Sequence, residues 1–320
     1  MPKIVIAGGT GMIGRELAAS LSTDGADLII LSREVGRKAV APGVTAKVIN
    51  WDPRDPSGQA ALADVLADAN AVVNLTGMPV GPLPWTAGRR KRILASRVDP
   101  TRYLVAALGT LDPSRRPAVF VCASGIDGYT DADVVAGTED TDVSGAVGFL
   151  ADVGRAWEGA AVGAEALGMR VVLVRTAFVL ARRSALLPLL ALPVRLFAGG
   201  RFGSGKQWFS WVHIDDLVAA YRYGIADASV RGPLIAAAPE PCRQSELVAT
   251  LARVLRRPNW LPIPAWVLRL VLREEATLLL GSRRVVPARL LASGFSFRYG
   301  NLEAALREAL GRPTADSGPE

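Results

Sequence analysis

Residues suited to metal binding and to disulfide formation are scarce in this chain. Among its 320 residues there is one histidine, His213, and there are two cysteines, Cys122 and Cys242. A histidine-rich metal site is therefore excluded, and no CxxC pair or carboxylate cluster replaces it, so we predict no metal. Two cysteines are too few for a disulfide framework, and the apolar run around Cys122 indicates a free thiol packed in the core.

Long hydrophobic runs are missing as well. Hydrophobic residues make up 50% of the chain, but no uninterrupted run reaches the roughly 18 to 20 residues that span a bilayer. The best candidate, residues 185–198, contains Pro188, Pro193 and Arg195, and we interpret it as a buried or substrate-side helix. No cleavable hydrophobic segment precedes the first strand. We therefore expect a cytoplasmic protein without a membrane partner.

Acidic residues are fewer than basic ones, 30 against 37, which gives a formal net charge of +7. A basic excess raises the hypothesis of nucleic-acid binding. The arginines, however, are spread along the predicted helices, with modest clusters at residues 89–92, 256–257 and 283–284 and no basic tail. We therefore expect an anionic cofactor and solvated helix faces, and no nucleic-acid partner.

The segment KIVIAGGTGMIG, residues 3–14, runs from an apolar strand through a glycine-rich loop into a helix. Glycine is needed where such a loop turns with positive φ or approaches a pyrophosphate closely, and the free N–H groups of the helix then face the phosphates. Both GxxGxxG and GxGxxG spacings fit, so spacing alone does not separate short-chain from ordinary Rossmann loops. The segment predicts a dinucleotide site with the contact residues Gly8, Thr10, Gly11, Met12, Ile13 and Gly14.

Apolar runs rich in valine and isoleucine alternate with amphipathic helical patterns over the first half of the chain. Such runs are typical of parallel strands that helices cover on both faces. The expected strands are residues 4–7, 28–31, 46–49, 71–75, 119–122 and 171–174. The pattern predicts an α/β fold, a doubly wound parallel sheet of Rossmann type, with a smaller C-terminal substrate lobe.

The regular alternation ends near Arg182, and the sequence that follows is richer in proline, tryptophan and leucine. We therefore assign residues 1–182 to an NADP-binding Rossmann domain, to which residues 207–240 return, and most of 183–312 to the substrate-side lobe. Residues 313–320 are expected to form a frayed tail. The apolar stretch 258–280 is suited to line a pocket, to cover the core or to meet another subunit, so a monomer and a homodimer both stay open.

Three further strand ends carry candidate cofactor residues. The second strand ends in Ser32 and Arg33, with Arg37 and Lys38 close behind, where an NAD-specific protein usually has a carboxylate for the ribose 2′-hydroxyl. Arginine there suits a 2′-phosphate, so NADP(H) is the predicted cofactor. Asp52, after the third strand, is predicted to accept from the adenine amine, although ordinary loop chemistry explains it equally well. The same alternative holds for the turn after the fourth strand, which contains Asn74, Leu75 and Gly77.

Several segments in combination resemble the extended short-chain dehydrogenase/reductase superfamily. They are AGGTGMIG (7–14), NLTG (74–77), WTAGRRKRILASRV (85–98), FLADVGRAWE (149–158), GSGKQWFSWVHIDDLV (203–218) and RRVVPARLLASGFSFRY (283–299). Within that superfamily the chain is similar to the NADP-binding epimerase-family branch with a C-terminal DUF1731-type segment. The resemblance covers nearly the full length and implies a Rossmann fold and an NADP(H)-dependent oxidoreductase, epimerase or dehydratase.

The resemblance fails at the residues that usually transfer the proton. The superfamily uses a Tyr-x-x-x-Lys couple, in which the lysine lowers the pKa of the tyrosine hydroxyl and holds the nicotinamide ribose. None of the five tyrosines has lysine four positions later, and Phe149 and Val153 occupy the nearest matching positions. Because a phenyl ring cannot transfer a proton, the usual chemistry would require a substitute acid in this chain.

Ser124, in the CASG segment, matches the serine that the resemblance places beside the nicotinamide; a serine capping its own loop is the alternative. Tyr129 is the first candidate for the substitute acid, although its loop reads DGYT where this branch has a GYYG-like sequence. Glu139 is a second candidate, and a solvated loop carboxylate explains it as well. His213 could transfer protons near neutral pH, but its place just before Asp215 favours a structural role at a helix start.

Four residues are predicted to face the substrate. Trp85 and Arg89 follow the NLTG turn, as does Arg97, and an arginine there suits an anionic substrate as well as a salt bridge on a helix face. Gln207 and Trp208 are interpreted as pocket wall, because indole rings bury large apolar area and also stack on planar ligands. The sequence does not name the substrate.

Three functions are compatible with these residues. The first is an NADP-dependent oxidoreductase or epimerase-like enzyme acting on a small organic substrate, with hydride moving between the nicotinamide and a carbon near Ser124. The second is a non-redox enzyme that catalyses epimerisation, cyclisation or elimination on the same scaffold. The third is an NADP-sensing protein that binds a partner without turnover, with a partner affinity that differs between the oxidised and reduced cofactor.

Overall fold

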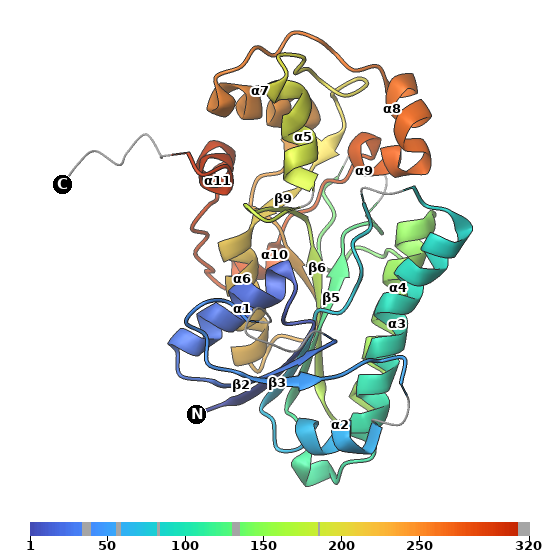
Figure 1. Ribbon diagram of the computed structural model, residues 1–320, viewed down its shortest axis with the longest axis vertical. Helices are drawn as coiled ribbons and strands as arrows, with labels where there is room; N and C mark the ends of the chain where they lie inside the picture. Colours follow the sequence, from blue (N-terminus) through green and yellow to red (C-terminus); the bar gives the residue numbers. More distant parts are fainter. Residues whose placement is uncertain (34–39, 56–58, 82–83, 130–134, 185, 313–320) are drawn as a thin grey trace, which may run out of the picture.

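A computed structural model describes residues 1–33, 40–55, 59–81, 84–129, 135–184 and 186–312. Its main element is a seven-stranded sheet with the order β10-β6-β5-β4-β1-β2-β3 (Figure 1). Every pairing in this sheet is parallel, which confirms the doubly wound α/β fold expected from the sequence. The strands are β1 (Lys3–Ala7), β2 (Asp27–Ser32), β3 (Lys47–Asn50), β4 (Ala71–Asn74), β5 (Val119–Gly125), β6 (Arg170–Thr176) and β10 (Gly232–Ala236).

Helices cover both faces of the sheet. Helices α1 and α6 pack against each other on one face, whereas α2, α3 and α4 form the layer on the other (Figure 1). Among the described residues, no helix combines the length and the apolar character needed to cross a bilayer. These five helices are α1 (Met12–Thr23), α2 (Gln59–Leu66), α3 (Ala87–Gly109), α4 (Phe149–Val162) and α6 (Ile214–Ala226).

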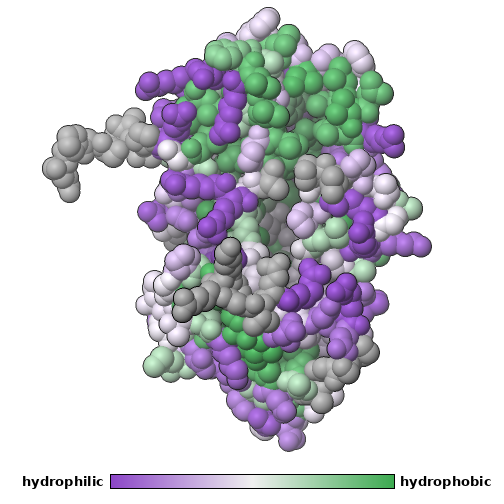
Figure 2. All heavy atoms as spheres, viewed as in Figure 1, coloured by the Kyte–Doolittle hydropathy of each residue, from purple (hydrophilic) through white to green (hydrophobic). Residues whose placement is uncertain are grey.

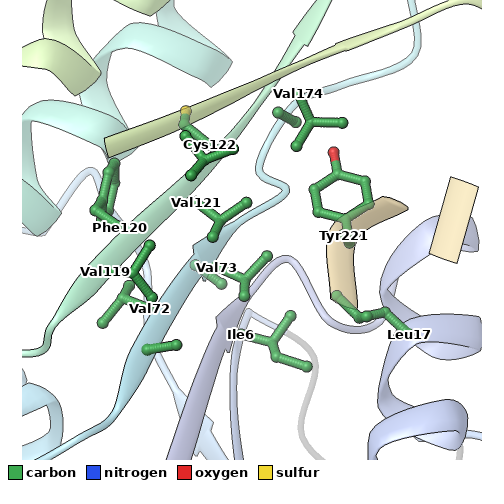
Figure 3. Close-up of a cluster of buried hydrophobic side chains, with 14 of the residues drawn as sticks. Ile6, Leu17, Val72, Val73, Val119, Phe120, Val121, Cys122, Val174 and Tyr221 are labelled. Carbon is green, nitrogen blue, oxygen red and sulfur yellow. The ribbon is translucent and has the colours of Figure 1, made fainter. Parts of the chain in front are cut away.

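The centre of the sheet is closed to solvent on both faces. Figure 3 shows valine and isoleucine side chains of the central strands, with Leu17 of α1 and Tyr221 of α6 packed against them. Burial on both faces explains why the strand sequences lack polar alternation. Cys122 belongs to this core, as the sequence predicted, and burial raises the pKa of its thiol.

After β6 the chain leaves the large sheet, and it returns to the sheet at β10. Strand β9 (Trp211–His213) pairs in parallel with β7 (Phe178–Leu180), α6 follows directly, and β10 then joins the edge of the sheet beside β6. The sequence pattern did not predict β10, because its GPLIA sequence has a single β-branched residue.

A second hydrophobic core lies in the lobe above the sheet (Figure 1). On α5 it buries Leu187, Leu190 and Val194, whereas Leu192 and Leu196 are 53% and 67% exposed. The prediction of a buried helix at residues 185–198 is therefore right for one face only. The other elements of the lobe are β8 (Trp208–Phe209), β11 (Cys242–Arg243), α5 (Leu186–Arg195), α7 (Gln244–Leu255), α8 (Ala265–Leu272), α9 (Thr277–Leu280) and α11 (Leu302–Ala309). Helix α10 (Ala288–Ala292) packs instead against β10 of the large sheet.

Candidate functional site

The glycine loop between β1 and α1 leaves no room for side chains at two positions. Gly8 has φ +80°, and a Cβ on it would lie 2.9 Å from the backbone carbonyl of Leu75 in the loop after β4. A Cβ on Gly14 would lie 2.5 Å from the Cα of Gly9. The loop is thus pressed between the β4 loop and the first turn of α1, as a dinucleotide-binding loop requires.

The N-terminus of α1 is open for an anion. Its N-cap residue, Gly11, offers no side-chain acceptor, and the first turn contains no carboxylate. Among the described residues, the backbone N–H groups of Met12 and Ile13 have no hydrogen-bond acceptor. Unpaired N–H groups and the positive end of the helix dipole attract a phosphate group. The residues predicted from the sequence therefore fit the pyrophosphate of a dinucleotide.

Basic side chains surround the end of β2. Thr10 and Ser32 contact each other through their hydroxyl groups at 3.2 Å, and Arg33 beside them is exposed. The Arg54 guanidinium binds both oxygens of Asp52 and holds the pKa of that carboxyl at about 2, with a smaller contribution from the charge of Arg33. Since Arg54 already engages Asp52, the predicted adenine contact stays a prediction. Arg37 and Lys38 lie outside the described residues.

The turn after β4 is held by a side chain that faces inward. Asn74 is fully buried and donates from Nδ2 to the Thr101 hydroxyl of α3 at 2.7 Å. Its Oδ1 accepts from the backbone N–H and the hydroxyl of Thr76 at 3.1 and 2.6 Å, and the Leu75 N–H donates to the carbonyl of Ala7. Asn74 therefore shapes the turn, and a ligand contact would come from the backbone.

Ser124 ends β5 and begins a chain of buried polar contacts. Its hydroxyl donates to Oε1 of Glu158 on α4 at 2.6 Å. Arg175, which lies beside Ser124 on β6, binds the same carboxylate through Nε and Nη2 at 2.9 and 2.8 Å. The arginine and glutamate side chains are 8% and 16% exposed, so this bidentate pair is largely desolvated.

Tyr129 joins the same network at its far end. Its hydroxyl accepts from Nη1 of Arg175 at 2.8 Å and donates to the carbonyl of Thr138 at 3.0 Å. The ring is buried, and a Cβ on Gly137 would lie 2.3 Å from it. Burial raises the pKa of the Tyr129 hydroxyl, whereas the superfamily's tyrosine needs a lowered one. A proton-donating Tyr129 stays a prediction, and the visible role of the side chain is to hold Arg175.

The first turns of α4 carry apolar side chains where the resemblance would place the tyrosine and lysine. Phe149 packs edge-on against Trp85, with the ring centres 5.2 Å apart, and the Arg90 guanidinium lies 5.0 Å from the Phe149 ring. Val153 is buried. Trp85 also donates from its indole N–H to the carbonyl of Val80 at 2.7 Å. No proton donor is present at either position.

Arg97 on α3 lies beside the turn after β4, with its Cζ 3.2 Å from the place of a Cβ on Gly77. Nη1 donates to the carbonyl of Ile93 at 3.1 Å, and the Trp157 ring lies 5.3 Å from the guanidinium. Within the described ranges no carboxylate pairs with Arg97, and burial lowers its pKa to about 10. A partly desolvated cation without a direct ion-pair partner favours an anionic ligand group.

Asp127 and Arg283 complete this edge of the sheet. Asp127 pairs with Nη2 of Arg283 at 2.9 Å, and its other oxygen lies 3.3 Å from the place of a Cβ on Gly125. The charge of Asp127 also acts on Arg97. Helix α3, the loop after β5 and the segment after α9 thus bring charged groups together at the carboxyl ends of β4 and β5. Sequence reasoning missed the contributions of Asp127 and Arg283.

The predicted substrate residues have mostly structural partners. Arg89 is buried, with Nη2 bonded to the carbonyl of Pro79 at 3.0 Å. Gln207 donates from its amide to the carbonyls of Phe202 and Leu279 at 3.0 and 3.2 Å, although it also lines a pocket of about 460 Å³. These contacts hold the neighbouring loops in place.

Two guanidinium groups lie close to the Trp208 ring. Arg243 and Arg284 approach its ring at 3.7 and 4.3 Å. The indole N–H is buried and has no hydrogen-bond partner in the described part of the chain. Two cations therefore stack on the Trp208 ring, and its role as a pocket wall stays a prediction.

His213 and Glu139 have structural partners as well. The Nε2 of the fully buried His213 lies 2.8 Å from Glu308 of α11, and its Nδ1 accepts from the Asp215 N–H at the start of α6. Glu139 is buried and accepts from the N–H groups of Ile235 and Arg289. The structure therefore favours the structural alternative for His213 and places Glu139 in a loop-to-sheet contact.

The chain matches known families over most of its length. Residues 4–233 match the NAD dependent epimerase/dehydratase family, and residues 263–309 match the domain of unknown function DUF1731. It is 33% identical over 311 residues to "Epimerase family protein SDR39U1 homolog, chloroplastic" of Arabidopsis thaliana, covering 95% of this chain and 85% of that protein. It is likewise 33% identical over 307 residues to "Epimerase family protein YfhF" of Bacillus subtilis, covering 96% and 97%.

A solved structure supports the same relationship. The human epimerase family protein SDR39U1, determined with NADPH, aligns with a TM-score of 0.82 and 29% identity over 97% of this chain and 99% of that one. The resemblance drawn from the sequence motifs is confirmed. The chain belongs to the NAD dependent epimerase/dehydratase family, with a C-terminal DUF1731 segment.

Proposed function

We propose that this protein binds NADP(H) and acts as an oxidoreductase or epimerase on a small organic substrate. The observation that carries the proposal is the loop between β1 and α1, whose glycines pack too closely for side chains while the N–H groups of α1 stay unpaired. The bound NADPH of the human relative supports the same cofactor here. Gly8, Gly11 and Gly14 would cradle the pyrophosphate, and Arg33 would meet the 2′-phosphate.

The nicotinamide would supply a hydride donor or acceptor. Ser124 would hold the reacting oxygen of the substrate, because its hydroxyl lies at the carboxyl end of β5. Glu158 would take up or return the proton through that hydroxyl, to which it is bonded at 2.6 Å. Arg175 balances the carboxylate charge and fixes its orientation. Arg97 would attract an anionic group of the substrate or cofactor.

Removal of the Arg33 guanidinium is expected to weaken NADPH binding selectively. A charge-assisted contact to a phosphate contributes roughly 1.5–3 kcal/mol, which corresponds to about a 10- to 100-fold change in Kd. We expect that Arg33→Ala raises the Kd for NADPH by this factor and leaves the Kd for NADH unchanged, as measured by nicotinamide fluorescence. Arg92→Ala, at an exposed position of α3, is the matched control. If Arg33→Ala raised the Kd for NADPH and for NADH by the same factor, Arg33 would not be the residue that contacts the 2′-phosphate.

Ser124→Ala is expected to lower kcat by roughly 10²- to 10⁴-fold, the usual contribution of a positioned acid–base group. Tyr129→Phe should lower kcat as well, because it frees Arg175 from one of its contacts. Both variants should bind NADPH as the wild type does. The measurement is turnover of the carbonyl or alcohol substrate found by screening with wild-type protein. Full activity in both variants would show that the reacting carbon lies elsewhere.

The apolar Phe149 and Val153 favour one second candidate, a non-redox enzyme that epimerises, cyclises or eliminates on the same scaffold. In that case product forms while the cofactor absorbance stays constant, whereas net redox chemistry changes it in proportion to product. If NADP(H) binds but no substrate is converted, the remaining candidate is an NADP-sensing protein. Its partner affinity should then differ between NADPH and NADP⁺.

A further inference from the structure

Large apolar side chains are exposed together at one end of the C-terminal lobe. Eight of them come from α5, from the segment that follows α7 and from α8, and they are between 42% and 71% exposed. Figure 2 shows apolar surface gathered over the upper lobe, in the region of α5 and α8. We call these residues the apolar cap: Leu192, Leu196, Phe197, Trp260, Leu261, Trp266, Leu270 and Val271.

The segments that carry the apolar cap are joined by defined contacts. The Trp260 indole donates to the carbonyl of Phe197 at 2.9 Å. The backbone N–H groups of Trp260 and Leu261 both donate to the carbonyl of Gly199. Arg257 stacks on the Phe197 ring at 4.5 Å. The end of α5 and the segment before α8 therefore form one ordered surface, so the exposure of these side chains is a feature of the packed lobe.

The segments that carry the apolar cap are also rich in basic residues. Residues 182–206 and 253–273 contain ten basic residues and no acidic one, whereas the rest of the chain contains 27 basic and 30 acidic residues. The net charge of +7, which the sequence pattern suggested to be spread over the helices, is thus concentrated here. Seven of these ten basic residues are exposed arginines that form no ion pair within the described residues: Arg183, Arg195, Arg201, Arg256, Arg257, Arg269 and Arg273.

Helix α8 carries both exposed apolar side chains and an exposed arginine. Trp266 and Leu270 are four residues apart and share one face, to which the spacing of three residues adds Arg269. Leu268 on another face is buried in the lobe. Tryptophan and leucine flanked by arginine are typical of faces that lie in the headgroup region of a bilayer, where arginine stems extend along apolar surface and keep their charge in water.

We propose that the apolar cap docks on an anionic lipid surface. Charge complementarity selects this occupant over a second copy of the chain, because a two-fold contact would oppose arginine with arginine and no acidic residue lies in either segment. It also selects a membrane over a nucleic acid, since the centre of the surface is apolar and phosphate backbones are bound by charge. We expected no membrane partner from the sequence because no segment is long enough to span a bilayer, but a contact at the membrane surface does not require a spanning segment.

The test uses the full-length protein and two kinds of vesicle, one of phosphatidylcholine alone and one with about a third phosphatidylglycerol, in a flotation assay. We expect binding to the anionic vesicles and little to the neutral ones, with a bound fraction that falls as salt shortens the Debye length. The variants Trp266→Ser/Leu270→Ser and Arg195→Gln/Arg269→Gln should each lower the partition coefficient about tenfold or more.

The control variants replace apolar or arginine side chains by the same residues, serine or glutamine, at exposed positions outside the apolar cap. Val147→Ser/Val162→Ser and Arg92→Gln/Arg102→Gln remove similar groups away from the apolar cap and should bind the vesicles as the wild type does. Retained NADPH binding in all variants shows that they are folded. No vesicle binding by the wild type, or equal losses in controls and cap variants, would overturn the proposal. The proposal would also be overturned if the wild type formed a dimer in sedimentation, or bound duplex DNA, and the cap variants lost that property while the control variants kept it.

Discussion

Gly14→Ala is expected to abolish measurable NADPH binding, an increase in Kd of at least about 100-fold, and to destabilise the fold by roughly 1–3 kcal/mol. The added Cβ would lie 2.5 Å from the Cα of Gly9 and 2.6 Å from the carbonyl oxygen of Gly8. Both atoms belong to the backbone, so no side chain can rotate away. The loop itself must move, and the N–H groups that it presents at the start of α1 move with it.

Nicotinamide fluorescence gives the affinity of the Gly14 variant, and urea denaturation gives its free energy of unfolding. The matched control is Gly159→Ala on α4, where an added Cβ meets nothing within 4 Å. That exchange should raise the free energy of unfolding by about 0.5–1 kcal/mol, because alanine is the better helix former. A Gly14→Ala protein that binds NADPH normally would show that the loop is not the phosphate site.

Arg175→Met is expected to lower the free energy of unfolding by about 3–5 kcal/mol, which makes it the most destabilising exchange considered. The arginine is 8% exposed and supplies two hydrogen bonds to Glu158 and one to Tyr129. Its removal leaves a largely buried carboxylate whose remaining side-chain partner is the Ser124 hydroxyl. An unpaired buried charge is far less stable than either the intact pair or a neutral replacement.

A double-variant cycle separates this effect from lost packing. Arg175→Met/Glu158→Gln removes both charges, and we expect it to recover at least about 1 kcal/mol relative to Arg175→Met alone. Arg155→Met is the control, because Arg155 on the same helix as Glu158 pairs with Asp152 in solvent and should contribute about 0–1 kcal/mol. If Arg175→Met were as mild as Arg155→Met, the Ser124 network would not be a rigid support for the site.

The sequence indicated the glycine loop more directly than the polar network around Ser124. The requirement for glycine at positions 8 and 14 follows from the strand and helix that flank them, so it can be predicted from neighbouring residues of the sequence. The Glu158–Arg175 pair was missed, although an arginine inside the apolar run VVLVRT was a signal for a buried partner. Its partner lies 17 residues away on another element, and no periodicity connects the two.

Side-chain direction was harder to predict from the sequence. Arg89 and Gln207 were predicted to face the substrate, and each has partners that hold a neighbouring loop. Polar side chains near a strand end satisfy buried backbone groups as readily as they meet ligands. Which of the two happens depends on the neighbours that packing brings near them.

The sequence by itself determined the parallel sheet, the glycine loop and the absence of a Tyr-x-x-x-Lys couple, because each depends on residues close together in the chain. The tertiary structure decided which charges meet at Ser124 and Arg97, and it showed that α5 and α8 each have apolar side chains that face outward. Hydropathy measures how strongly a segment avoids water. It does not say whether the lobe has enough neighbouring surface to cover that segment, and here one face of α5 and one face of α8 stay uncovered.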